Sequence, residues 1–112
     1  MKDLIGYLTQ RIETDKAETV RLETEGRQDE ANFVKVRANI YDVCRKVTNA
    51  LLDRPGAGKE AVKTQLERFR TVWGAALEKA RENGDAKGIV VEETKLEALA
   101  DVCARFTAAR CE

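Results

Sequence analysis

The sequence predicts an all-α fold, an up-down-up-down four-helix bundle with antiparallel neighbours and short loops. Apolar residues recur at alternating spacings of three and four in several segments, which is typical of helices with one buried face. The chain has a single proline and 36% charged residues, a composition typical of helical proteins. Glycine-containing breaks separate four segments of similar length, and short connections make neighbouring helices antiparallel. We therefore expect residues 1–112 to form a single helical-bundle domain.

The first helix is expected from Lys2 to Glu25. Its apolar stripe consists of Leu4, Ile5, Leu8 and Ile12. Continued at the same spacing, the stripe places Asp15 and Thr19 inside, whereas Val20 is apolar on a shifted phase. We therefore expect the second half of this helix to be less buried, or its register to slip. Gly26 is expected to end the helix, because glycine adopts a left-handed conformation at little cost.

The second helix is expected from Gln28 to Asp53, and it carries the most regular stripe. That stripe consists of Phe33, Val36, Ile40, Val43, Val47 and Ala50. The helix is expected to stop at Asp53 because Arg54 precedes Pro55, and a residue before proline disfavours helical backbone.

The third helix is expected from Lys59 to Asn83. Its stripe consists of Val62, Leu66, Phe69, Trp73, Ala76 and Ala80. Trp73 is expected to be largely buried at the centre of the core, near Phe69. Gly74 costs about 1 kcal/mol relative to alanine inside a helix. We expect close packing around Gly74 to compensate for that cost.

The fourth helix is expected from Glu92 to Arg110, after a linker at 85–91 whose apolar residues 89–91 cover one end of the core. Its stripe consists of Leu96, Leu99, Val102, Cys103 and Phe106. Antiparallel stacking is expected to bring all four helices into every layer of the core. Short matches at offsets of 59 (42–44 with 101–103) and 57 (11–14 with 68–71) fit either a repeated hairpin or chance similarity between amphipathic helices.

Composition and charge argue against several classes of function. Lysine plus arginine and aspartate plus glutamate both number 20, so the basic excess usual in a nucleic-acid-binding protein is missing. The sequence has no apolar run long enough for a membrane span, and its charged N-terminus is not typical of a signal peptide. Three scattered cysteines favour a reducing, cytoplasmic setting. Of these, Cys44 and Cys103 are expected to be buried and Cys111 to be an exposed thiol.

The sequence contains no histidine, which excludes Ser-His-Asp and Cys-His catalysis and the Glu-x-x-His di-iron site of helical bundles. Glu93, Glu97 and Asp101 lie four residues apart on one helix face. Such a row could hold Mg²⁺ or Mn²⁺ if a facing helix added carboxylates, and Asp42 is the one obvious candidate. The simpler interpretation is a solvated face, and we expect no metal or cofactor.

A strip of the second helix, Val34, Ala38 and Tyr41, is apolar beyond the heptad stripe. We expect this strip to stay partly exposed and to form a modest interface with a protein partner or a second copy in a homodimer. The alternative is that neighbouring helices cover it. The sequence therefore favours a protein–protein interaction or regulatory module. Binding of a small apolar ligand, or a metal-dependent hydrolase using the carboxylate row, are the alternatives.

Overall fold

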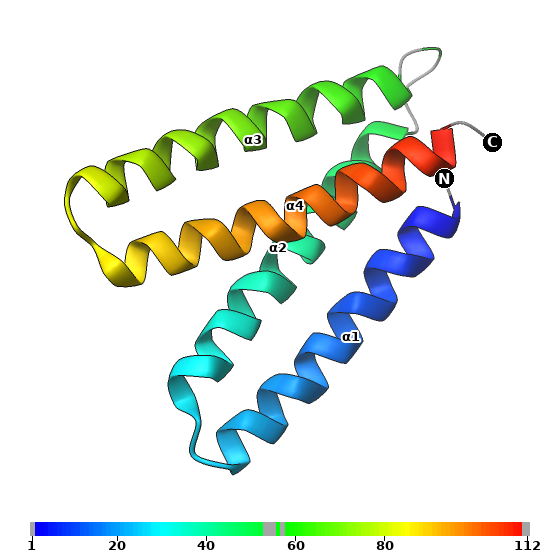
Figure 1. Ribbon diagram of the computed structural model, residues 1–112. Helices are drawn as coiled ribbons and strands as arrows, with labels where there is room; N and C mark the ends of the chain where they lie inside the picture. Colours follow the sequence, from blue (N-terminus) through cyan, green and yellow to red (C-terminus); the bar gives the residue numbers. More distant parts are fainter. Residues whose placement is uncertain (1, 53–55, 57, 111–112) are drawn as a thin grey trace.

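The computed structural model describes residues 2–52, 56 and 58–110, and it confirms the all-α fold. Its helices are α1 (Lys2–Thr24), α2 (Gln28–Leu52), α3 (Gly58–Glu82) and α4 (Ala86–Arg110). They run up, down, up and down (Figure 1). The predicted end at Asp53 lies outside the described residues. No described helix has an apolar stretch that could cross a bilayer.

The bundle consists of two antiparallel pairs, a first hairpin (α1 and α2) and a second hairpin (α3 and α4). In Figure 1 the hairpins meet near the two chain ends and diverge towards their turns, and α4 crosses α2. Helices α2 and α4 pack against each other, whereas α1 and α3 do not come into contact over their described lengths. The prediction that every layer contains all four helices was therefore wrong at the diverging ends. There, Leu22 and Ala31 are buried within the first hairpin, and Leu77 and Ala80 within the second.

The two hairpins repeat with an offset of 58 residues. Helix α1 ends at Thr24 and α3 at Glu82, and both bounds of α2 differ from those of α4 by the same offset. Their turns are alike. The Arg27 amide donates to the Leu22 carbonyl at 2.8 Å, and the Asp85 amide to the Ala80 carbonyl at 2.9 Å. Gly26 and Gly84, with φ of 77° and 63°, allow this helix-ending turn, which favours glycine.

Burial follows the same repeat. The paired buried positions are Leu4/Val62, Leu8/Leu66, Thr19/Leu77, Leu22/Ala80, Ile40/Ala98, Tyr41/Leu99, Cys44/Val102 and Thr48/Phe106. The sequence matches at 59 and 57 are each one residue out of this register, so residues 42–44 and 101–103 do not occupy equivalent places. The structural repeat therefore lies in the buried pattern and the turns, not in those matches.

Helix α4 starts earlier than predicted because Asp85 caps it. The Gly88 amide donates to Asp85 Oδ1 at 3.0 Å, which satisfies one of the amides left unpaired at a helix N-terminus. The apolar run 89–91 is therefore helical and not a linker.

Two expectations about α3 were wrong. Trp73 lies beside Phe69 as expected, with the ring centroids 4.8 Å apart, but it is partly buried against the edge of the core and not at its centre. A Cβ added at Gly74 would meet no atom within 4 Å, so no close packing compensates for this glycine. The fully buried core lies elsewhere, around the contact between α2 and α4, and includes residues of α1 and of the first half of α3. It consists of Leu4, Leu8, Ile12, Ile40, Tyr41, Cys44, Val62, Leu66, Ala98, Leu99, Val102 and Phe106.

Cys44 and Cys103 are both free thiols. Cys44 is fully buried, and burial, with the neighbouring Cys103, raises the pKa of its thiol to about 12. Cys103 is half-buried, less than expected. Cys111 lies outside the described residues.

Candidate functional site: the outer groove of the first hairpin

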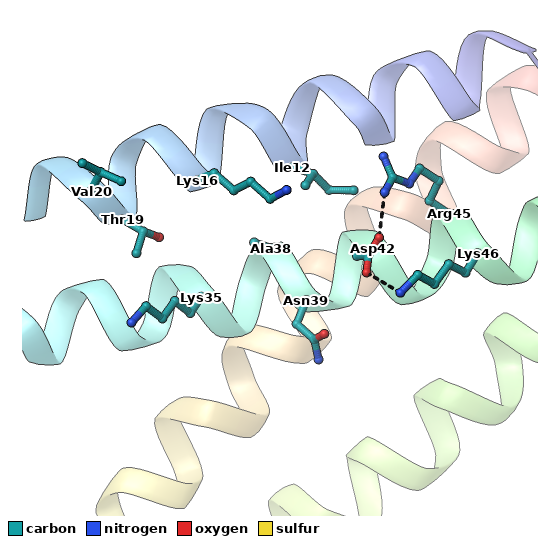
Figure 2. A pocket seen from close by; sticks show the side chains of 10 residues that line it. All are labelled: Ile12, Lys16, Thr19, Val20, Lys35, Ala38, Asn39, Asp42, Arg45 and Lys46. Atoms are coloured by element: carbon teal, nitrogen blue, oxygen red, sulfur yellow. Dashed lines mark hydrogen bonds and ion pairs between the residues drawn. The ribbon is translucent and has the colours of Figure 1, made fainter. Parts of the chain in front are cut away.

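A shallow, open hollow of about 770 Å³ lies between α1 and α2 (Figure 2). We call it the outer groove. It is lined by Ile12, Lys16, Thr19, Val20, Lys35, Ala38, Asn39, Asp42, Arg45 and Lys46. All ten residues belong to the first hairpin, and in Figure 2 α4 passes behind α2.

The groove exists because small side chains line the contact between α1 and α2. Ala38 and Thr19 lie in its floor, and the second hairpin has Leu96 and Leu77 at the equivalent positions. Ile12 and Val20 add apolar surface at either end of the α1 side. Val20 is 63% exposed. The floor therefore offers accessible apolar surface in a concave setting.

The rim of the groove is mainly cationic. Lys16 comes from α1, and Lys35, Arg45 and Lys46 come from α2. Asp42 is the one carboxylate among the lining residues.

Asp42 orders one end of the rim. Its Oδ1 accepts from Arg45 at 2.8 Å and its Oδ2 from Lys46 at 2.9 Å, as Figure 2 shows. Lys46, and after it Arg45, hold the pKa of Asp42 below its usual range despite its partial burial. Asp42 is therefore an anion that positions Arg45 and Lys46, and both of its oxygens are already paired with them.

A second polar group, which we call the inner polar cluster, links α1, α2 and α4. Tyr7 Oη donates to Asp101 Oδ2 at 2.5 Å, and Tyr41 Oη donates to the same oxygen at 2.8 Å. Burial and the hydrogen bond to Asp101 raise the pKa of both tyrosines, that of Tyr41 to about 12. The guanidiniums of Arg105 and Arg11 lie over the rings of Tyr7 and Tyr41, at 4.1 and 5.1 Å.

The same cluster contains an ion pair between a buried carboxylate and an arginine whose side chain is 37% exposed. Asp15 is fully buried, and the Arg37 guanidinium donates to both of its oxygens at 2.8–3.2 Å. Thr19 is also buried, and its hydroxyl donates to the Asp15 carbonyl at 2.8 Å. The predicted register slip in α1 was therefore wrong. The stripe continues through Asp15 because Arg37 provides the partner that a buried carboxylate needs.

The inner polar cluster surrounds a hollow of about 330 Å³, but this hollow favours no ligand. Arg11 and Arg37 face it together with Glu97 and Asp101, so its charges balance. Both tyrosine hydroxyls already donate hydrogen bonds to Asp101. The arrangement ties α4 to the first hairpin and is best explained as structural.

The predicted interaction strip is divided between these two places. Ala38 lines the outer groove, and Val34 is half-buried beside it. Tyr41 is only 2% exposed and points to Asp101, so its predicted partial exposure was wrong. The reason is the crossing of α4 over α2, which covers this part of the strip.

The predicted carboxylate row is also divided. Glu93 and Glu97 are exposed, whereas Asp101 accepts from two tyrosines and Asp42 from two cations. Among the residues the structure describes, no three cysteine or carboxylate side chains converge as a metal site would require.

The four rim cations were not among the site residues predicted from the sequence. Their signal was present: Lys35 and Lys46 lie about three helical turns apart on one face of α2, with Arg45 next to Lys46. Comparison of the chain with protein-family models, with curated proteins and with solved structures finds no match.

Proposed function

We propose that this chain is a protein-binding module that acts through the outer groove. The observation that carries the proposal is the accessible apolar surface of Val20 and Ala38, in a hollow lined by the first hairpin alone. Concave surfaces with an apolar floor and a polar rim are typical of recognition sites.

The shape of the groove favours a helical segment over a small molecule. Small-ligand sites enclose most of their ligand, whereas this hollow is open. Two antiparallel helices present a channel into which the apolar face of a third helix fits. On α2 the lining extends from Lys35 to Lys46, about 16 Å at 1.5 Å per residue, which corresponds to roughly three helical turns.

Site-specific crosslinking tests this proposal. A photoreactive amino acid placed at position 20 should give a discrete protein adduct in cells of the source organism. Position 72 is the matched control, because Val72 is 61% exposed and Val20 63%, but Val72 lies on α3 outside the groove. Equal adducts at both positions, or none at position 20, would contradict the proposal.

A groove-filling variant provides a second arm. Ala38→Leu should abolish the adduct at position 20 because the added side chain occupies the floor. The first hairpin should accommodate it, since the second hairpin has Leu96 at the equivalent position. Ala75→Leu adds the same side chain to an exposed site on α3 and should leave the adduct unchanged.

A further inference from the structure

We infer that the outer groove binds an acidic amphipathic helix, an inference that rests on the function proposed above. The groove has four cationic side chains against one carboxylate, a surplus of three positive charges. The whole chain has no net charge, so this surplus is concentrated locally. A partner helix with carboxylates on both flanks of its apolar face would complement the rim.

The second hairpin shows that these charges are not a general property of the repeated hairpin. Equivalent to Val20, Lys35 and Asn39 are the acidic residues Glu78, Glu93 and Glu97. Equivalent to Lys16, Arg45 and Lys46 are the uncharged residues Gly74, Cys103 and Ala104. The hairpins thus agree in their buried positions and differ at the groove, where the first has both the hollow and the cations.

Several rim cations can still bind a carboxylate of a partner. No carboxylate among the described residues lies within ion-pairing distance of Lys16. The side chain of Lys46 is 73% exposed although its ammonium contacts Asp42. Lys35 is paired with Glu23 at 3.2 Å, but both side chains are largely exposed, and such pairs contribute little and exchange readily.

The positions of these groups define the partner. Apolar residues on successive turns would contact Val20 and Ala38, while acidic residues on the flanks would reach Lys16 on α1 and Lys35 or Lys46 on α2 (Figure 2). An anionic membrane surface would also attract the cations. The concave floor disfavours it, because the apolar groups of a membrane-binding surface must project into the bilayer.

Two labelled helical peptides of equal length test the inference against the whole chain. Both have the same apolar residues on one face, and the flanking positions are glutamate in one and lysine in the other. Fluorescence anisotropy should show the acidic peptide binding at least about tenfold more tightly, with the difference shrinking at high salt.

Charge-reversal variants locate the effect. The double variant Lys16→Glu/Lys46→Glu should reverse the preference towards the lysine peptide, and Lys16→Gln/Lys46→Gln should remove most of it. The control Lys63→Glu/Lys79→Glu reverses two exposed lysines of α3 and should leave the preference unchanged. Circular dichroism and the thermal midpoint establish that each variant is folded.

The remaining outcomes overturn the inference in distinguishable ways. Equal binding of both peptides would mean that the groove binds helices without selecting their charge. The inference of an acidic partner would then be wrong, and the proposed protein-binding function would remain. Binding of neither peptide, with an adduct still formed at position 20, would mean a partner of other chemistry. Binding of neither, without an adduct, would remove both proposals. Binding of vesicles containing anionic lipid, without binding of the acidic peptide, would identify a membrane surface instead.

Discussion

The same interior position is filled by opposite chemistry in the two hairpins. Asp15 of α1 and Trp73 of α3 are equivalent under the offset of 58, as are their neighbours one turn earlier, Arg11 and Phe69. In the first hairpin Asp15 is fully buried and paired with Arg37. In the second hairpin Trp73 is half-buried and stacked on Phe69.

This difference shows that the same helical hairpin can be stabilised at this position either by an ion pair or by an aromatic stack. A buried carboxylate must be desolvated, and its net contribution depends on a well-placed partner. An aromatic stack needs no specific partner and is stabilised by the area it buries and by ring packing. The stability of the first hairpin should therefore depend strongly on single polar residues. In the second hairpin, the loss of stability on substitution should follow the area that the side chain buries.

The largest effect is expected from Arg37→Ala. It leaves the buried Asp15 without its partner. Because the Arg37 side chain is itself 37% exposed, the expected cost is at the lower end of the range for a buried pair, about 3 kcal/mol. Chemical denaturation measures the change in the free energy of unfolding.

The control is Asp15→Leu combined with Arg37→Met, which removes both charges. This variant should lose much less stability than Arg37→Ala, because buried pairs can often be replaced by apolar residues at little cost. An Arg37→Ala protein as stable as the wild type would mean that Asp15 is not buried.

Trp73→Ala should have a smaller effect, about 2 kcal/mol. A fully buried aromatic residue typically costs about 3–5 kcal/mol when truncated, and Trp73 is only half-buried. Denaturation of Trp73→Ala can be followed by circular dichroism. A loss as large as that of Arg37→Ala would contradict the contrast between the hairpins.

The tyrosines of the inner polar cluster should make stability depend on pH at the alkaline end. The pKa of Tyr41 is raised from about 10 to about 12, so the folded state disfavours its phenolate. The resulting stabilisation is complete below pH 10 and is lost as the pH rises towards 12.

Tyr41→Phe should weaken this alkaline loss, and at neutral pH it should cost about 1–2 kcal/mol for the hydrogen bond to Asp101. Unfolding measured across this pH range, with Tyr7 retained, checks both effects. An unchanged alkaline profile in Tyr41→Phe would show that other groups cause it.

The smallest effect is expected at Gly74, where the second hairpin has no side chain and the first has Lys16. Gly74→Ala should stabilise the protein by about 0.5–1 kcal/mol, because alanine is the better helix former and the added Cβ meets no atom within 4 Å. Gly58→Ala is the contrast and should destabilise it, because a Cβ there would lie 2.6 Å from the Leu52 carbonyl oxygen. Thermal unfolding distinguishes the two signs.

The sequence by itself determined the number of helices, their bounds to within a few residues except at the start of α4, and the stop of the first helix at Gly26. These features are local, because helical periodicity and glycine turns involve residues only a few positions apart. The stripe of α1 also indicated which face of that helix would be buried. The stripe predicted for α2 was wrong, because only Ile40 of its six residues is buried and the buried face lies instead on Ala31, Tyr41, Cys44 and Thr48.

Only the tertiary structure decided which helix covers each face. The divergence of the hairpins left Val20 and Ala38 accessible, and the crossing of α4 buried Tyr41 against Asp101. Arg37 became the partner of Asp15 across 22 residues of sequence. Periodicity indicates that a helix face is buried, but not which helix covers it. The covering helix depends on how the helices cross.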